Sequence, residues 1–153
     1  MVGYRCLMAQ ADLHEAVTVR LRATDQRYTT GRRRLVELLA GVGAPVTIVQ
    51  ILELDRTLAQ SSVYRNMVVL EEAGVVSRIV ATDDFFRYEL AEDLTGHHHH
   101  HLICKACGDV ADFALSPAAE SELARALGRA ARKASFAVNH HRLDLVGVCA
   151  SCR

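Results

Sequence analysis

"LAQSSVYRNMVVLEEAGVV", residues 58–76, predicts the amphipathic helix on which the fold of the first part of the chain depends. Val63, Met67 and Leu70 recur at spacings of four and three, so one stripe of the helix is apolar and suited to burial. A helix that carries hydroxyl, phenol and guanidinium groups near its start can meet phosphates and base edges in a DNA major groove. The face opposite the apolar stripe carries Ser61, Tyr64, Arg65 and Val68.

The two ends of this helix and the segment after it are also marked in the sequence. Ser61 or Ser62 is expected to cap its start, and Gly74 to end it in the left-handed conformation. The following run, "SRIVATDDFFRYEL" (77–90), has two β-rich segments on either side of a turn signal at residues 82–84. A β-hairpin is therefore expected directly after the helix.

Further helices are expected before residue 58. Apolar spacing predicts one over about 12–23, and a second over "TGRRRLVELLAG", capped by Thr30 and ended by Gly41. Thr47 is a good N-cap for a short third helix. Helices followed at once by a hairpin favour a winged helix-turn-helix, although a small helical bundle with an ordinary amphipathic helix fits the same pattern.

Charge is unevenly distributed along a chain whose formal net charge is zero. Neutrality argues against a uniformly basic nucleic-acid binder, but "DQRYTTGRRR" (25–34) is a local basic patch that can sit on phosphates. A solvated face would explain the same run. Residues 1–35 contain three acids (Asp12, Glu15 and Asp25) against seven arginines (Arg5, Arg20, Arg22, Arg27, Arg32, Arg33 and Arg34).

Composition places the chain among soluble globular proteins. Half of its 153 residues are apolar, so a core can form, yet no apolar run approaches the roughly 20 residues that span a membrane. The first residues are too mixed for a secretory signal. We expect a cytoplasmic protein, with no membrane partner, whose five cysteines are not in disulfides. Cys6 is given no role.

The second part of the chain starts near residues 91–96, and we divide the chain into domains 1–92 and 93–153. Residues 100–104 and 110–115 have strand character on either side of a Cys-x-x-Cys knuckle. Ser116-Pro117 is a strong helix start, and "FAVNHHRLDLVGV" (136–148) predicts one or two strands. So small a unit needs a metal or a partner subunit to stabilise it.

Two Cys-x-x-Cys pairs form the most specific signal in the sequence. Four thiolates suit tetrahedral zinc, and the absence of an open position indicates a structural site. We favour this over a redox dithiol. The pairs are far apart in sequence, so the fold must bring them together: Cys104, Cys107, Cys149 and Cys152.

Five consecutive histidines, residues 97–101, run into the strand that carries the first cysteine pair. An expression tag normally sits at a terminus, so we reject that interpretation, and we rank a loose metal sponge below ordered sites. On a strand, His97, His99 and His101 would face one way and His98 and His100 the other. Neutral imidazoles bind zinc, iron, nickel or copper, so the alternation permits two sites. We expect His97 and His140 to be solvated. Possible partners are Glu89, Glu120 and the pair His140-His141.

Taken together, these motifs resemble the ferric uptake regulator (Fur) family of bacterial metal-responsive repressors over residues 12–153. The resemblance rests on Thr29 and Arg32 in "TTGRRRLVELL", on Val63-Tyr64-Arg65, on Arg87-Tyr88-Glu89-Leu90, on "HHHHHLICKACG" and on the closing "CASC". It implies an α+β fold in which an N-terminal winged helix binds DNA. A C-terminal α/β domain then forms the homodimer and holds structural zinc on the four cysteines.

The resemblance also implies roles for particular residues. Tyr64 and Arg65 would contact DNA, helped by Ser61 and Ser62, with Arg32 close to the backbone. A regulatory metal at the hinge between the domains would draw on Glu89, His99 and His101. A second metal in the dimerisation domain would be bound by His98, His100, Glu120 and His141.

The sequence departs from the family pattern around the hinge site. No histidine precedes the third helix in "GAPVT" (43–47), and that helix and the turn after it are short. Where zinc sensors of the family often place Asp and Cys ligands, this chain has Ser77 and Glu89. The site would then use three protein ligands, or water, or recruit Asp83, Asp84 or Glu92. The run of five histidines resembles that of zinc-responsive members of the family. A site without a sulfur ligand, by contrast, suits Fe²⁺ or Mn²⁺ better. Between these two indications we expect zinc.

The sequence-based hypothesis is therefore a metal-dependent transcriptional repressor that binds a pseudo-palindromic double-stranded operator as a homodimer. An iron-, manganese- or peroxide-responsive regulator of the same family is an alternative, and so is a metal-buffering protein. A zinc hydrolase would need an open metal and a general base, and no His-Glu-x-x-His motif occurs. We expect no enzymatic activity.

Overall fold

The computed structural model describes residues 10–81, 83 and 85–153, and the fold is α+β as predicted. Cys6 and two residues of the predicted turn, 82 and 84, lie outside the described residues. The chain divides into two compact units, one ending at His98 and the other beginning at His99.

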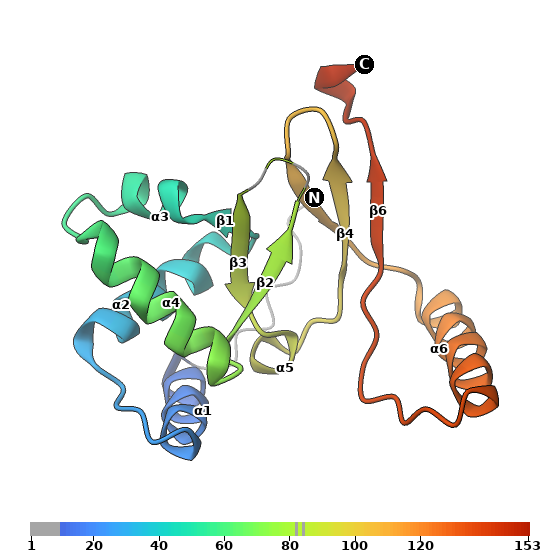
Figure 1. Ribbon diagram of the computed structural model, residues 1–153, viewed down its shortest axis with the longest axis horizontal. Helices are drawn as coiled ribbons and strands as arrows, with labels where there is room; N and C mark the ends of the chain where they lie inside the picture. The colour runs from blue at the N-terminus through green and yellow to red at the C-terminus, as the bar shows by residue number, and fades with distance from the viewer. Residues whose placement is uncertain (1–9, 82, 84) are drawn as a thin grey trace. The chain divides into compact units, whose positions relative to one another are not determined.

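The first unit is a winged helix (Figure 1). Three strands form an antiparallel sheet in the order β1-β3-β2, and the β2-β3 hairpin directly follows α4. The sequence-based expectation of a winged helix-turn-helix is confirmed. Its elements are α1 (Gln10–Ala23), α2 (Thr30–Val42), β1 (Val46–Thr47), α3 (Ile48–Leu54), α4 (Gln60–Glu72), β2 (Val76–Val80), β3 (Phe86–Leu90) and α5 (Glu92–Thr95).

The predicted stripe of α4 is the centre of this unit's core. Val63, Met67 and Leu70 are almost completely buried, together with residues from α1, α2, α3 and the sheet. Burial of such side chains stabilises the fold by about 1.5–3 kcal/mol each. The opposite face of α4 therefore stays in solvent.

The caps of the helices differ in part from prediction. The capping box on α3 is present: Thr47 accepts a hydrogen bond from the Gln50 amide, and the Gln50 side chain accepts one from the Thr47 amide. For α2, however, Thr29 and not Thr30 is the cap, because a capping oxygen must reach the amide three residues ahead, here that of Arg32.

Two further helix-end predictions are corrected, and one is confirmed. Helix α2 runs to Val42 and is capped by Gly43, with φ +64°, and not by Gly41, because Gly43 is the glycine in the left-handed conformation. Helix α4 starts at Gln60, so Ser61 and Ser62 fall inside its first turn and the cap is Ala59, without a side-chain bond. Gly74 follows α4 at φ +66°, as predicted.

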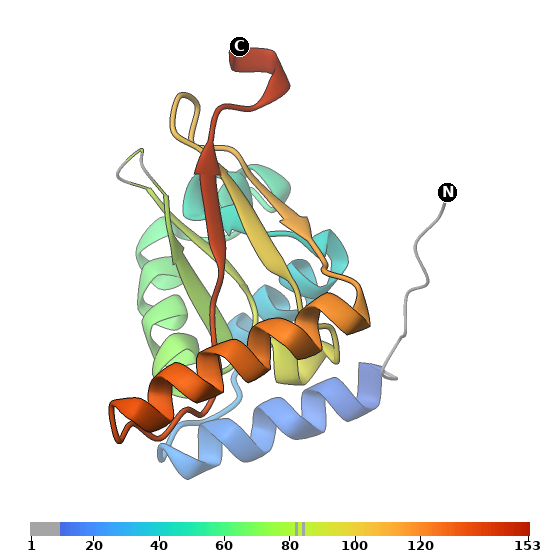
Figure 2. The same cartoon turned by 90° about the vertical axis from the view of Figure 1, so that its right-hand side faces the viewer.

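The second unit is a three-stranded sheet with one long helix (Figure 2). Strand β4 lies between β5, with which it pairs antiparallel, and β6, with which it pairs parallel. Ser116 caps α6 as predicted, and none of the helix's residues is buried within the described chain. The elements are β4 (His100–Cys104), β5 (Val110–Phe113), α6 (Pro117–Lys133), β6 (Asp144–Gly147) and a 3₁₀ turn (Ala150–Cys152).

Among the described residues, every helix is too short or too polar to cross a lipid bilayer.

Candidate metal sites and nucleic-acid interface

The four cysteines of the two Cys-x-x-Cys pairs converge at one end of the β4-β6 sheet. Cys104 ends β4, Cys107 lies in the knuckle after it, and Cys149 and Cys152 follow β6. Their sulfur atoms all lie within 4.8 Å of one another, and the Sγ atoms of Cys107 and Cys149 are 3.8 Å apart. Zinc–sulfur bonds of about 2.3 Å in a tetrahedron separate the sulfurs by roughly 3.8 Å, so the group fits structural zinc.

Hydrogen bonds stabilise the thiolate form of one of these four cysteines. Backbone N–H groups, first that of Cys149 at 3.3 Å, donate to the Cys104 sulfur and lower the pKa of that thiol to about 6. Contact with the Cys149 and Cys107 sulfurs raises the pKa of Cys152 to about 12. Four thiolates cannot gather without a cation, and a bound Zn²⁺ would supply that charge.

A second group of ligands lies on one face of the sheet. The ligand atoms of His99, His101 and Asp112 lie within 4.8 Å of one another. His101 is 5% exposed and stands opposite Asp112 in the β4-β5 register. The rings of His99 and His101 meet edge to face, with centroids 5.1 Å apart. These two imidazoles and one carboxylate fit a divalent metal with nitrogen and oxygen ligands.

Asp112 is a ligand candidate that the sequence analysis missed. The β4-β5 hairpin pairs Ile103 with Val110 and therefore His101 with Asp112. Counting outward symmetrically from Cys104 and Cys107 would instead have placed Asp112 opposite His99, so the spacing in the sequence did not by itself give this pairing.

The third group lies on the other face of β4. The carboxylate of Glu120, near the start of α6, lies between two imidazoles. Its Oε2 is 2.9 Å from Nε2 of the fully buried His100, and its Oε1 is 2.9 Å from Nε2 of His141. The two imidazole rings are 5.6 Å apart. Adjacent histidines of β4 thus contribute to different groups. His97 and His140 are exposed to solvent.

Two predicted ligands lie in the first unit. Glu89 is buried in β3, opposite Ser77 of β2. His98 directly precedes the second unit, and its Nδ1 is 2.7 Å from a carboxylate oxygen of Glu92. Whether Glu89 joins the His99 group and His98 joins the His100 group stays a prediction.

Asp83, named above as a possible additional ligand of the hinge metal, already forms an ion pair with Arg87. Both of its oxygens accept hydrogen bonds from Arg87, at 2.7 and 2.6 Å. This guanidinium holds the pKa of Asp83 below its usual range. A carboxylate paired in this way is a weak metal ligand, because binding a metal would leave the buried Arg87 without its partner.

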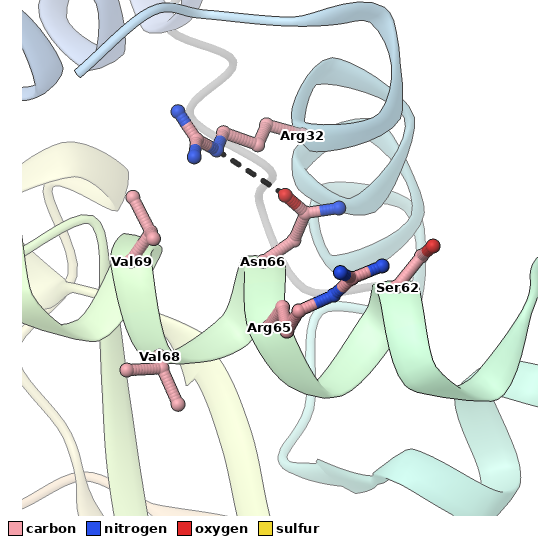
Figure 3. A pocket seen from close by; sticks show the side chains of 6 residues that line it. All are labelled: Arg32, Ser62, Arg65, Asn66, Val68 and Val69. Carbon is pink, nitrogen blue, oxygen red and sulfur yellow. Dashed lines mark hydrogen bonds between the residues drawn. The ribbon is translucent and has the colours of Figure 1, made fainter.

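The exposed face of α4 presents the predicted DNA-contacting side chains. Tyr64 is half exposed, and Ser61 and Arg65 are also exposed. A groove of about 520 Å³ runs beside them (Figure 3), lined by Arg32, Ser62, Arg65, Asn66, Val68 and Val69. The lining combines two guanidinium groups, a hydroxyl and an amide with two valines, so its polar groups can meet phosphate oxygens while its valines offer apolar contact.

Arg32 is held in place at the side of this groove. Its Nε donates to the Asn66 Oδ1 at 3.3 Å, as Figure 3 shows. Its two terminal nitrogens donate to the Arg27 carbonyl at 2.5 Å and to the Gln26 side chain at 3.1 Å. The guanidinium thus ties α2, α4 and the loop between α1 and α2 together.

A winged helix followed by a unit rich in metal ligands defines a metal-binding transcription regulator. The chain matches the model of the ferric uptake regulator family over residues 23–146. It is 32% identical, over 149 residues, to the peroxide operon regulator of Bacillus subtilis (95% of this chain and 96% of that protein). The protein described here belongs to the ferric uptake regulator family, as its motifs predicted.

A second relative and a solved structure are also similar to this chain. The peroxide-responsive repressor PerR of Staphylococcus aureus is 29% identical over 146 residues, which cover 93% of this chain and 92% of that protein. The structure of the Helicobacter pylori ferric uptake regulator has the same fold, with a TM-score of 0.73 at 23% identity, covering 98% of this chain and 97% of that chain.

Family membership decides the class of activity. Members are regulators of transcription that bind DNA and divalent metals and act as dimers, and they are not enzymes. The hydrolase alternative is thereby excluded, as expected.

Proposed function

We propose that this protein is a metal-dependent DNA-binding repressor that controls metal-ion homeostasis. The observation that carries the proposal is the gathering of His99, His101 and Asp112 on one face of the sheet, in a chain whose other unit exposes hydroxyl, phenol and guanidinium groups on one face of α4. A metal bound at such a group can connect the ligand unit to the DNA-binding unit. Only a metal that prefers the DNA-competent arrangement can shift the equilibrium.

In this proposal α4 enters the major groove of double-stranded DNA. Tyr64 and Arg65 contact the DNA from its exposed face, with Ser61 and Ser62 at its first turn. Arg32 lies near the sugar-phosphate backbone. Two copies related by two-fold symmetry would read the halves of a pseudo-palindromic operator.

Apolar side chains on the second unit support a homodimer. Leu102 of β4 and Leu145 of β6 are in register and both more than two-fifths exposed, and Leu127 of α6 is also exposed. A second copy of the chain would cover these residues and give the small sheet the core that it lacks alone.

The hinge metal would be bound by Glu89, His99 and His101, with Asp112 as a fourth ligand. All four donors are nitrogen or oxygen, which favours Fe²⁺ or Mn²⁺ over the zinc that the sequence analysis expected. Metal binding at this group would change operator affinity roughly 5- to 150-fold, for a coupling of about 1–3 kcal/mol. A second metal would be bound by His98, His100, Glu120 and His141, and structural zinc by the four cysteines.

Operator binding as a function of metal tests the proposal. The purified protein, with structural zinc retained, is titrated separately with Zn²⁺, Fe²⁺ and Mn²⁺ while operator-length DNA binding is followed by fluorescence anisotropy. We expect binding to appear with one metal and to disappear in the His99→Ala/His101→Ala variant.

The exposed His97→Ala/His140→Ala variant serves as the matched control, since it also removes two imidazoles. DNA binding that is independent of every metal would contradict the proposal. A protein that binds metal but never DNA would be the metal buffer that the sequence analysis kept as an alternative.

A peroxide-responsive regulator is the second candidate, favoured by the two peroxide regulators among the relatives at about 30% identity. Adding hydrogen peroxide to the Fe²⁺-loaded and Mn²⁺-loaded complexes with DNA distinguishes the two functions. Loss of binding from the Fe²⁺ form alone would favour peroxide sensing. Equal resistance of both forms would favour sensing of the metal itself.

A further inference from the structure

His101 is flanked by an aspartate on each side. In the sheet of the second unit it stands opposite Asp112 of β5 and opposite Asp144 of β6. Side chains in register on neighbouring strands share one face of a sheet and stand about 5 Å apart. The three residues therefore form one row across the sheet, with the imidazole in the middle.

The two aspartates differ in what they contact. Asp112 offers a ligand atom to the group of His99 and His101. The Asp144 carboxylate instead lies against the imidazole: its Oδ1 is 3.0 Å from Nδ1 of His101. Since Nδ1 faces a carboxylate, the ring that donates its Nδ1 proton keeps Nε2 for a metal.

Arg142 keeps Asp144 from acting as a ligand itself. Its Nε donates to Oδ1 of Asp144 at 3.1 Å, and its Nη2 forms an ion pair with Oδ2 at 2.9 Å. Both carboxylate oxygens are thus occupied by a forked guanidinium in addition to the imidazole. A carboxylate saturated in this way orients its neighbour better than it binds a cation.

We propose that Asp144 is the positioning residue of the hinge metal site, holding His101 with its proton on Nδ1 and its Nε2 available to the metal. This inference rests on the proposed function for the role of that metal, but the contact belongs to the chain itself. A carboxylate behind a ligand histidine fixes the ring and makes it a better donor. His101 is almost fully buried, so while Asp144 is in place its carboxylate and not bulk water is the acceptor beside Nδ1.

The tautomer of His101 is measured first, in the full-length protein with structural zinc retained and the other sites free of metal. Nitrogen-15 chemical shifts of the imidazole at pH 8 distinguish a protonated ring nitrogen from an unprotonated one. The expected result is a proton on Nδ1 of His101. A proton on Nε2 would overturn the proposal.

Metal affinity is measured next in a Glu120→Gln/His141→Ala background, which disables the second metal group, by titrating Co²⁺ into the zinc-retaining protein and following the visible absorption of Co²⁺ bound to nitrogen and oxygen ligands. We expect Asp144→Ala to weaken Co²⁺ binding at the hinge group roughly 10- to 100-fold, as loss of such a partner does elsewhere. Asp144→Asn keeps an acceptor for Nδ1, so it should restore part of the affinity. Unchanged affinity in Asp144→Ala would contradict the role.

Two comparisons separate this role from a general loss of structure. Glu122→Gln removes an exposed carboxylate from α6 and should leave Co²⁺ binding unchanged. Structural zinc content should stay the same in the Asp144 variants. If the wild-type protein took up no metal at the hinge group, the proposed function would fail, while the His101 tautomer would still decide whether Asp144 holds the ring.

Discussion

Nδ1 of His14 lies 2.7 Å from the hydroxyl oxygen of Tyr28, which connects helix α1 to the loop that leads into α2. The Nε2 atom of the same ring lies 3.4 Å from a carboxylate oxygen of Glu37 on α2. Burial, followed by the charge of Arg33, lowers the pKa of His14 below its ordinary value of 6.5. Burial likewise raises the pKa of Tyr28 to about 12. His14 is therefore neutral in the folded winged helix at pH 7.

Acid should lower the free energy of unfolding through protonation of His14. Because its folded pKa is lowered, the unfolded chain binds this proton more readily. The contribution to stability is complete above pH 6.5 and is lost as the pH falls through the folded pKa. His14→Gln should cost about 1 kcal/mol of unfolding free energy at pH 7.5, where a hydrogen bond is lost. The difference from wild type should then shrink below pH 6.

Urea denaturation of both proteins across this pH range is the measurement. Tyr28→Phe is the matched control, since it removes the same hydrogen bond but leaves the buried imidazole, and so should keep the acid-side loss. A His14→Gln deficit that stayed constant from pH 7.5 to 5 would show that this ring does not titrate on unfolding.

Alanine substitutions of Thr47 and of Ser61 should change the free energy of unfolding by different amounts. Thr47 forms a capping box with Gln50 at the start of α3, so Thr47→Ala should cost about 1 kcal/mol. Ser61 lies inside the first turn of α4 without a capping role, and Ser61→Ala should change stability by less than about 0.5 kcal/mol. Thermal or urea unfolding measures both. Equal losses would mean that α4 is capped as the sequence analysis expected.

Arg65→Ala should weaken operator binding by about 1–3 kcal/mol at fixed salt, because an exposed guanidinium on the DNA-contacting face is removed. Its metal content should not change. Anisotropy with operator DNA and metal analysis give the two values. Arg129→Ala, an equally exposed arginine on α6, is the control and should bind as wild type does. Equal losses in the two variants would point to net charge and not to the α4 face.

Cys107→Ser should release the structural metal. Its sulfur lies 3.8 Å from that of Cys149, and the remaining three thiolates would lack the fourth ligand. We expect one zinc fewer per chain and loss of amide protection in β4, β5 and β6, because metal binding contributes directly to the folding of small sites. Ser151→Ala, at an exposed residue between two of the cysteines, should retain the zinc. Full protection of the sheet in a zinc-free Cys107→Ser protein would refute this.

Local sequence determined the elements and their chemistry. Spacing of Val63, Met67 and Leu70 was enough to place α4 and its buried stripe, because helix periodicity is a property of consecutive residues. Ser116-Pro117 marked the start of α6 for a similarly local reason. Cap positions were less well predicted: Thr29 caps α2 in place of Thr30, and Gly43 in place of Gly41, since a shift of one or two residues hardly changes the local pattern.

The pairing of distant strands was decided only in the folded chain. Alternation along β4 separates the two histidine sets, but nothing local to His101 indicates that Asp144 stands beside it. That neighbour depends on the parallel register of β4 with β6, and the connection between them includes the whole of α6. Register is set by burial across the sheet and not by the sequence of either strand alone. The sequence therefore supplied the ligand types, while the tertiary structure placed Asp112 and Asp144 on either side of His101, which is the basis of the different roles proposed for them.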